Sequence, residues 1–434
     1  MNPSQPTTVR YQTVGWLTLA AALAYLCRNA VSVAESTIRQ DMGLTLSQSG
    51  WFMGSFFWTY AIFQVPSGWF SGRFGTRKAL TLFALGWAFA MMGICLTSVF
   101  LILLLGQLLL GVAQAGIFPA STNSIGHWMP LAHRTLACGF LAAGMQIGAV
   151  LASGLTGVLL IPFGWRGTFF LFALPSVLWA VGFYLQFRDL PSQNQKVNAL
   201  ELALIHEGRD TEAKGPLVKT NEFRTLLTLV NRPVMYFLCG QQICRAAGYM
   251  FFASWFPTFL QETRGVTVAQ SGFLQGLVLV GTLFGSLFGG MLTDFIWRRT
   301  GDNRLSRSGV GAGALGICGL LIFGAWFVEN PATAVALMAL GSLFAALAGP
   351  CALAATIDIG GSRVPQVYGL MNMCGNFAAA ACPVLVAKLF QWTENWNVVL
   401  LMFSGVYLTG AACWLFANPK TQNRDNQIGR ESNH

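Results

Sequence analysis

The chain consists of apolar runs about 20 residues long, separated by short polar stretches. In a helix, a run of that length spans the hydrocarbon core of a bilayer, which is roughly 30 Å thick. The pattern therefore predicts an all-α integral membrane protein with twelve transmembrane helices. They are predicted at residues 15–37, 50–71, 79–97, 100–122, 137–160, 168–187, 233–259, 271–295, 309–328, 333–356, 366–390 and 397–417.

One long hydrophilic break, residues 188–232, divides the predicted helices into six and six. We expect residues 1–187 to form an N-terminal six-helix bundle and residues 233–417 to form a C-terminal one. The break is then a cytoplasmic linker, in which residues 196–210 can form a short amphipathic helix. Residues 418–434 are expected to be a cytoplasmic tail.

Composition supports a membrane protein, because 54% of the residues are hydrophobic and only 10% are charged. Soluble domains carry about 25% charged residues. The net charge of +10 comes from Lys and Arg that lie mostly in short loops, so no nucleic-acid partner is expected. All ten cysteines fall inside apolar runs and should pack as small hydrophobic residues. We expect neither a disulfide, nor a metal, nor a cofactor.

The basic residues also predict the orientation of the chain. With both termini in the cytoplasm, 20 of the 26 Lys and Arg residues fall on the cytoplasmic side. This bias follows the positive-inside rule and is expected for a bacterial inner (plasma) membrane protein. Arg28 and Arg245 belong to no loop, since each lies in the middle of a predicted helix.

The two halves of the chain repeat one another. After the second and the eighth predicted helices, a glycine leads into a basic tight turn at the same place in each six-helix half. These loop residues are Gly68, Arg73, Gly75, Arg77 and Lys78 in the first half, and Gly290, Asp294 and Arg298 in the second. We expect them to have a structural role. Internal duplication in a twelve-helix protein predicts a transporter with a central site between its halves.

Arg28 and Arg245 are the main candidates for that site. An arginine at the bilayer centre costs about 2.5 to 3.5 kcal/mol on insertion scales, so it should face a wet cavity or a partner. The seventh predicted helix is the pseudo-symmetry mate of the first, so both arginines can face the central cavity. A guanidinium offers a planar fork of donors that matches carboxylate, sulfonate or phosphate groups. We expect both to bind an anion; the alternative for each is a structural ion pair.

Polar residues at helical spacing extend the candidate site. The remaining substrate-binding candidates are Tyr25, Tyr60, Gln64, Gln114, Gln242, Tyr249, Asn372 and Asn376. For any single amide or tyrosine, the alternative is an interhelical hydrogen bond without a ligand. Glu35 and Gln107 are candidates for coupling or gating. Glu35 could pair with Arg28, act as a gate or proton site, or be the solvated end of its helix.

The loop that begins at Gly68 resembles the signature loop of the major facilitator superfamily, which has the form G-x-x-x-D-R-x-G-R-K. This resemblance implies two pseudo-symmetric six-helix bundles that work by alternating access. The chain departs from the signature at Gly72, where the family usually has an acid, whereas Asp294 keeps the acid in the second half. The departure puts the charge pairing of the first loop in question.

Four further motifs resemble the anion:cation symporter family, which includes bacterial organic-acid carriers, sialin and the vesicular glutamate transporters. They are Tyr25-x-x-Arg28-Asn29, the stretch from Gly111 to Ala120, Trp255-Phe-Pro257-Thr-Phe-Leu, and the stretch from Tyr368 to Asn376. In that family, acids carry the coupling proton. Many bacterial members have an acid where this chain has Cys27, and a family Arg and Glu correspond to Gln107 and Gln114.

The sequence therefore predicts a secondary active transporter, not an enzyme, for a small organic anion of the carboxylate or sugar-acid class. We expect it to work as a monomer in the lipid bilayer, with a proton, another cation or a counter-anion as the coupled ion. One alternative is an organophosphate or phosphate antiporter of the same fold, which the paired arginines and missing acids favour. Another is a receptor-like membrane protein that does not transport.

Overall fold

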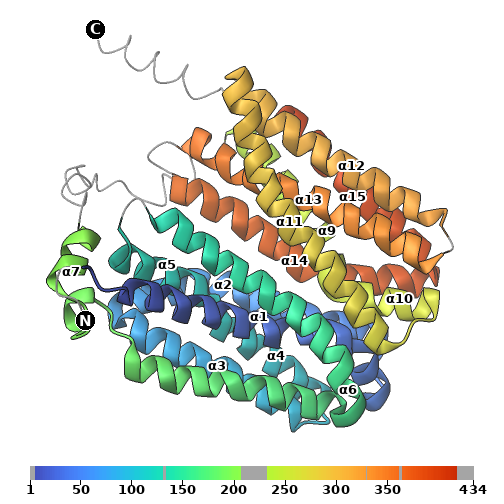
Figure 1. The fold of residues 1–434 in the computed structure, drawn as a ribbon. Helices are drawn as coiled ribbons and strands as arrows, with labels where there is room; N and C mark the ends of the chain where they lie inside the picture. Colours follow the sequence, from blue (N-terminus) through green and yellow to red (C-terminus); the bar gives the residue numbers. More distant parts are fainter. Residues whose placement is uncertain (1–4, 131–132, 207–231, 329, 361–363, 418–434) are drawn as a thin grey trace. The chain divides into compact units, whose positions relative to one another are not determined.

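The structure is a computed structural model, and its regular elements are helical throughout the described residues (Figure 1). The chain separates into two compact units, unit 1 (residues 1–218) and unit 2 (residues 219–434). The predicted tail and much of the predicted linker lie outside the described residues. The described ranges are 5–130, 133–206, 232–328, 330–360 and 364–417.

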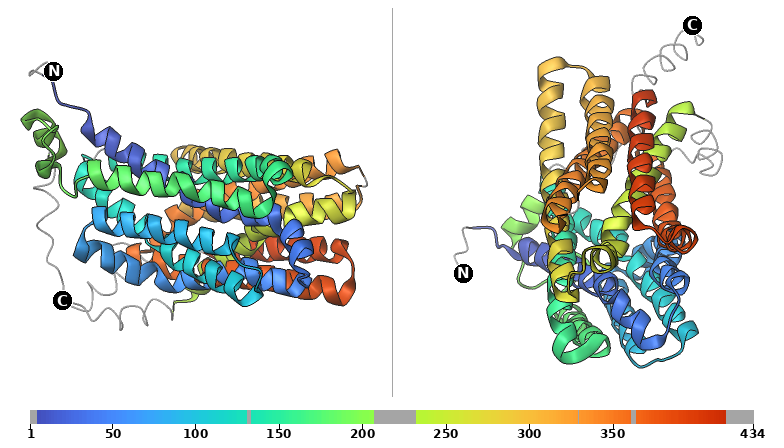
Figure 2. Two further views of the ribbon diagram at one scale, coloured as in Figure 1. Left: turned by 90° about the horizontal axis from the view of Figure 1, so that it is seen from below. Right: turned by 90° about the vertical axis from the view of Figure 1, so that its right-hand side faces the viewer.

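Unit 1 holds six long or medium helices that run side by side (Figure 2). They are α1 (Val9–Met42), α2 (Leu46–Phe74), α3 (Thr76–Cys95), α4 (Phe100–Ala115), α5 (Ile117–Trp128) and α6 (Arg134–Gln186). The predicted fourth helix corresponds to α4 with the first part of α5, and these meet at Gly116, where an added Cβ would overlap the Phe83 ring. Two predicted helices lie within α6, which is interrupted at Gly164 (φ 60°, ψ −179°). Glycine adopts this positive φ at little cost.

Unit 2 also consists of helices, and two of its segments are π-helical. Its elements are α9 (Pro233–Met250), η4 (Phe251–Trp255), α10 (Phe256–Arg264), α11 (Val268–Thr300), η5 (Arg304–Gly309), α12 (Val310–Trp326), α13 (Pro331–Gly360), α14 (Val364–Thr393) and α15 (Trp396–Phe416). The π-helices are η4 and η5. The predicted seventh helix is therefore divided into α9, η4 and the beginning of α10.

The two units repeat the same helix contacts. In unit 1, α2 packs on α4 and α3 on α6; in unit 2, α11 packs on α13 and α12 on α15. Both α2 and α11 begin with a capping box, formed by Thr45 with Gln48 and by Thr267 with Gln270. Each box opens the same short sequence, Thr-x-x-Gln-Ser-Gly. This shared start is a further sequence repeat between the two halves, separate from the two basic loops.

Glycines allow the paired helices to approach closely. An added Cβ at Gly111 of α4 would overlap the carbonyl oxygen of Phe56 on α2. At Gly285 of α11, it would overlap the carbonyl oxygen of Leu343 on α13. Small residues at such crossings are typical of helix packing in membranes.

Nine helices in the described part of the chain are long and apolar enough to cross a membrane. One of them, Ala137–Gln186, includes the interruption at Gly164. Neither α2 nor the segment from α9 to α10 is among the nine. By length and composition, these nine helices are candidate membrane spans.

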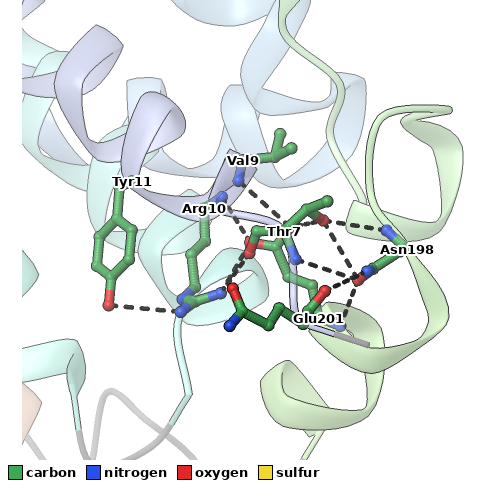
Figure 3. A network of polar contacts seen from close by, with 7 residues as sticks. Thr7, Val9, Arg10, Tyr11, Asn198 and Glu201 are labelled. Carbon is green, nitrogen blue, oxygen red and sulfur yellow. Dashed lines mark hydrogen bonds and ion pairs between the residues drawn. The ribbon is translucent and has the colours of Figure 1, made fainter. Parts of the chain in front are cut away.

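A buried carboxylate fixes the start of α1 to the linker helix α7 (Ala199–His206), as Figure 3 shows. Oε1 of Glu201 accepts hydrogen bonds from the backbone N–H and from Nη1 of Arg10, both at 3.0 Å. Oε2 accepts from the Thr7 hydroxyl at 2.5 Å and from the Val9 N–H at 3.3 Å. Glu201 thus satisfies N–H groups at the positive end of α1. α7 lies within residues 196–210, where an amphipathic helix is expected, and Glu201 is the residue through which it contacts α1.

Candidate functional site

Arg28 of α1 lies among four aromatic rings. The distances from its guanidinium carbon to the ring centroids are 4.5 Å for Phe57, 4.8 Å for Tyr25, 4.8 Å for Phe56 and 5.5 Å for Tyr60. Tyr25 lies one turn earlier on α1, and the other three rings belong to α2. Among the residues that the structure describes, no carboxylate is within ion-pair distance of Arg28.

The ring contacts stabilise the cation without neutralising it. A cation over an aromatic face gains about 0.5 to 1 kcal/mol at an exposed site and about 2 kcal/mol or more when desolvated. An anion approaches a guanidinium in its plane, where the N–H donors point. Arg28 is therefore held in place with a full positive charge. The structural ion pair considered for it is not found within the described ranges.

Glu35 does not form a solvated helix end, so that interpretation is wrong. Its side chain is 1% exposed, and Oε1 accepts a hydrogen bond from Nε of Arg39 at 2.9 Å. The reason is that α1 continues to Met42, beyond the predicted end, and keeps this turn packed inside unit 1. The ion pair of Glu35 is therefore with Arg39, which lies one turn beyond Glu35 on the side away from Arg28.

Cys27 points away from the rings around Arg28. Its Sγ lies 3.4 Å from the carbonyl oxygen of Phe172 and 3.9 Å from Oγ of Ser176, both on α6. The Cys27 side chain is fully buried. The position at which many relatives have an acid thus faces the contact between α1 and α6.

Gln114 forms an interhelical hydrogen bond, which is the alternative considered for the candidate amides. Its Nε2 donates to the carbonyl oxygen of Ala24 at 3.0 Å, and the residue is 2% exposed. The bond joins α4 to α1 at the residue before Tyr25. Gln107, two turns earlier on α4, is buried as well.

Tyr60 and Gln64 lie on α2, the helix that also carries Phe56 and Phe57, the two phenylalanines around Arg28. The Tyr60 ring is stacked on that of Phe56, with centroids 5.5 Å apart and planes at 22°. Gln64 is half-buried one turn later on α2. α2 therefore supplies three of the four rings as well as this amide.

In unit 2, Arg245 is held by a neutral amide. Its Nε and Nη2 donate to Oε1 of Gln242, one turn earlier on α9, at 3.3 and 3.0 Å. A Cβ at Gly349 of α13 would lie 3.6 Å from Nη1. Tyr249 lies one turn after Arg245 on α9, and Tyr368 lies on α14. As with Arg28, no carboxylate of the described residues pairs with this cation.

Asn372 and Asn376 lie on α14, which packs against α9 beside Arg245. Between them, Gly375 leaves room for Gln242, whose Cγ and Nε2 would both be 3.0 Å from an added Cβ. Nδ2 of Asn376 is buried and has no hydrogen-bond partner among the described residues. A buried donor without a partner costs about 1 to 3 kcal/mol, so this nitrogen is suited to an acceptor on a ligand.

The helix that carries Arg245 is interrupted at η4. Pro257, near the start of α10, has no backbone N–H to donate to a carbonyl of the preceding turn. That preceding turn is η4, whose π-helical hydrogen bonds differ from those of an α-helix. Gln275 of α11 is fully buried and donates Nε2 to the carbonyl oxygens of Phe252, at 2.9 Å, and of Ala253, at 3.3 Å. The sequence gives no signal for this role, because the carbonyls need a partner only once the π-helix forms.

A carboxylate just after the end of α6 binds the first basic loop, which lies between α2 and α3. Oδ1 of Asp189, which follows α6, accepts the backbone N–H of Arg77 at 2.8 Å. At Gly75 (φ 87°), an added Cβ would lie 2.6 Å from Oδ2 of the same residue. Asp189 thus binds the loop in which Gly72 replaces the usual acid. Sequence reasoning missed it because the two residues of this hydrogen bond are 112 positions apart.

The other loop residues lie at helix ends. Cβ of Pro119 would be 3.3 Å from a Cβ added at Gly68, whereas nothing lies within 4 Å of one at Gly290. Asp294 and Arg298, near the end of α11, are exposed, as are Arg73 and Lys78 in the first loop. Only the first loop therefore shows a close structural contact at its leading glycine.

Comparisons with known proteins agree with this architecture. The sequence matches the Major Facilitator Superfamily over residues 17–326 and again over residues 238–432. It is 29% identical to a probable sulfoacetate transporter of Cupriavidus necator over 420 residues, which are 96% of this chain and 95% of that protein. It is 26% identical to a probable galactarate/D-glucarate transporter of Bacillus subtilis over 415 residues, 91% and 89% of the two chains.

A hexuronate transporter of Bacillus subtilis is 26% identical over 406 residues, covering 93% of this chain and 92% of the relative. Among solved structures, a bacterial homolog to the human lysosomal transporter Spinster, in an inward-facing and unoccupied conformation, has the same fold. The TM-score is 0.74 at 18% identity, over 94% of each chain. The chain belongs to the Major Facilitator Superfamily of membrane transporters.

Proposed function

We propose that the protein is a secondary active transporter of a small organic anion of the carboxylate, sugar-acid or sulfonate class. The proposal rests on the surroundings of Arg28. This cation lies in a membrane helix and contacts four aromatic rings, and no carboxylate of the described residues neutralises it. Such a cation needs an anion, and aromatic rings offer its N–H donors no charged partner. The names of the relatives support the same substrate class.

Arg28 in unit 1 and Arg245 in unit 2 bind the anionic groups in this proposal. In this proposal Tyr25, whose ring centroid lies 4.8 Å from the Arg28 guanidinium carbon, selects the rest of the substrate together with Tyr249 of α9 and Asn376 of α14. Gln242 orients Arg245. The remaining candidates, which contribute less directly, are Tyr60, Gln64, Gln114 and Asn372.

The proposed topology has twelve membrane crossings in two six-helix bundles, with both termini in the cytoplasm of a bacterial cell. The nine apolar helices account for nine crossings. Division of the Ala137–Gln186 segment at Gly164 adds one, α2 adds one, and the interrupted segment from α9 to α10 adds the last. Alternating access of the two bundles then carries the anion across the bilayer.

A phosphate or organophosphate antiporter is the second candidate function. It is favoured by the neutral residues Cys27, Gln107 and Gln114, because exchange of one anion for another requires no proton-carrying acid. Sugar-acid and sulfoacetate relatives favour the first candidate. The two proposals differ in the substrate that drives uptake.

Uptake by purified protein in liposomes tests the proposal. The panel contains sugar acids, sulfoacetate, other mono- and dicarboxylates, phosphate and glycerol phosphate, each offered with and without the same anion inside. We expect saturable uptake of an organic acid or sulfonate that Arg28→Gln abolishes and Lys388→Gln preserves, since Lys388 is an exposed lysine on α14. Uptake of phosphate alone would establish the antiporter instead, and no uptake of any anion would contradict transport.

A further inference from the structure

A polar pocket of about 310 Å³ lies where α1 begins and α6 ends. Its lining comes from the first turns of α1, from the end of α6 and from linker residues 193–196. Two cationic side chains, Arg188 and Lys196, line it, and none of the described lining residues is acidic. Side-chain amides, among them Gln12 and Gln193, supply further polar groups. The pocket is therefore suited to an anion.

Hydrogen bonds between Thr7 and Asn198 hold the linker wall of the pocket in place (Figure 3). The Asn198 side chain accepts the backbone N–H of Thr7 at 3.2 Å, and the Asn198 N–H donates to the Thr7 hydroxyl at 3.1 Å. Glu201 adds the contacts with the start of α1 described above. Within the linker, Oδ1 of Asn194 accepts the N–H of Lys196 at 3.0 Å. The linker is thus fixed against α1 without any ligand.

Arg188 is anchored by one of its nitrogens. Nη1 donates to the carbonyl oxygens of Leu185 at 3.0 Å and Phe187 at 2.8 Å. Within the described ranges, its other side-chain nitrogens make no hydrogen bond. The side chain is held at the pocket while part of its donor fork remains for an anion.

An apolar strip of α6 leads to the same pocket. Leu174, Leu178, Val181 and Leu185 are 39%, 74%, 53% and 64% exposed. Their spacing of four, three and four residues places them on one face of the helix. Leu185 also lines the pocket. A ligand with an anionic head and an apolar tail would therefore contact both surfaces.

We propose that this pocket binds the headgroup of an anionic phospholipid, whose acyl chains lie along the exposed strip of α6. On the proposed topology the lipid belongs to the cytoplasmic leaflet, where basic pockets recognise such headgroups. The site is separate from Arg28 and does not depend on which anion is transported.

Native mass spectrometry of delipidated protein, titrated with phosphatidylglycerol or phosphatidylcholine, tests the site. We expect wild-type protein to prefer phosphatidylglycerol and Arg188→Gln/Lys196→Gln to bind it roughly 25-fold more weakly, at roughly fivefold per basic residue. Lys196→Gln alone, at an exposed position, should give about fivefold. Arg298→Gln/Arg299→Gln removes the same charge from exposed positions of unit 2 and should change nothing.

Three results would overturn the proposal. The first is equal binding of the two lipids by wild-type protein, and the second is unchanged phosphatidylglycerol affinity in both Lys196 variants. The third is competition by soluble glycerol phosphate as effective as that by the lipid, which would assign the pocket to a free phosphate compound.

Discussion

At the scale of single residues, Arg28 shows how a charge can be kept in an apolar helix without an acid beside it. The insertion cost of about 2.5 to 3.5 kcal/mol is comparable with what several cation–π contacts can return. A carboxylate would stabilise the arginine more strongly, but it would compete with any anionic ligand. The rings stabilise the cation without neutralising it, so its positive charge can still attract an anionic substrate.

Replacement of Phe57 by leucine tests the ring contacts. Phe57 is buried and its ring is the nearest to the guanidinium carbon, at 4.5 Å. We expect Phe57→Leu to raise the KM for uptake about two- to tenfold with little change in kcat, because Arg28 loses one of the contacts that orient it. Phe52→Leu is the control, since Phe52 is buried on the same helix and its ring is not among those around Arg28. An equal KM effect in both variants would show that packing, not the cation–π contact, is responsible.

The sequence identified Arg28, Tyr25 and Tyr60 because a charge or hydroxyl in an apolar run is conspicuous. It did not identify Phe56 and Phe57, since this chain has 34 phenylalanines and only the approach of α2 to α1 selects these two. The environment of Glu35 was also misjudged. Whether a carboxylate near a helix end is solvated depends on how far the helix continues and what packs on it.

At the scale of elements, the interrupted segment from α9 to α10 is stabilised by Gln275 of the neighbouring helix α11. Gln275 of α11 donates hydrogen bonds to the carbonyl oxygens of Phe252 and Ala253, which lie in η4 just before Pro257. An interruption at Pro257 follows from the sequence, because proline is recognisable on sight. Its π-helical form and its amide partner follow only from the packing of two helices.

Gln275→Leu should therefore destabilise unit 2. The change removes both hydrogen bonds to these buried carbonyls, at about 1 to 3 kcal/mol in all, and should lower the thermal unfolding midpoint of the purified protein by several degrees. Thr282→Val on the same helix is the control, because its hydroxyl bonds only back to the carbonyl of Val278 in its own helix. A midpoint no lower in Gln275→Leu than in Thr282→Val would contradict this role.

The turn between α2 and α3 gives a second test at this scale. Gly75→Ala should destabilise the protein by about 1 to 3 kcal/mol, because φ is 87° and the new Cβ would meet the Asp189 carboxylate. Gly72→Ala, three residues earlier in α2, should be neutral or slightly stabilising, since nothing lies within 4 Å of its added Cβ. Denaturation of both variants under identical conditions distinguishes them; similar losses would mean that Asp189 does not constrain the turn.

At the scale of the whole molecule, the all-helical fold of a membrane transporter was the most predictable feature, since long apolar runs and repeated loops are directly visible in a sequence. The acid that binds the first loop was not predictable, because Asp189 reaches it only after α3 and α6 have packed together. The neutral residues at Cys27, Gln107 and Gln114 bear on the coupling of transport, which belongs to the molecule as a whole.

We expect uptake to depend only weakly on a proton gradient. Cys27, Gln107 and Gln114 are neutral where the family resemblance implies charged residues, and Glu35, the acid of α1 nearer to Arg28 in sequence, is paired with Arg39. Uptake into liposomes at one external pH, with and without an imposed pH difference, should differ by less than about twofold. Strict dependence on the gradient that Glu35→Gln removes would instead identify Glu35 as the coupling residue.

Equilibrium binding of the transported anion to purified protein tests the central claim most directly. Isothermal titration should show that Arg28→Gln and Arg245→Gln each weaken the affinity about tenfold to 150-fold, as expected for loss of a charge-assisted hydrogen bond. Lys388→Gln should bind as tightly as the wild type. Unchanged affinity in Arg28→Gln, with the variant folded, would contradict the assignment of Arg28 as the anion-binding residue.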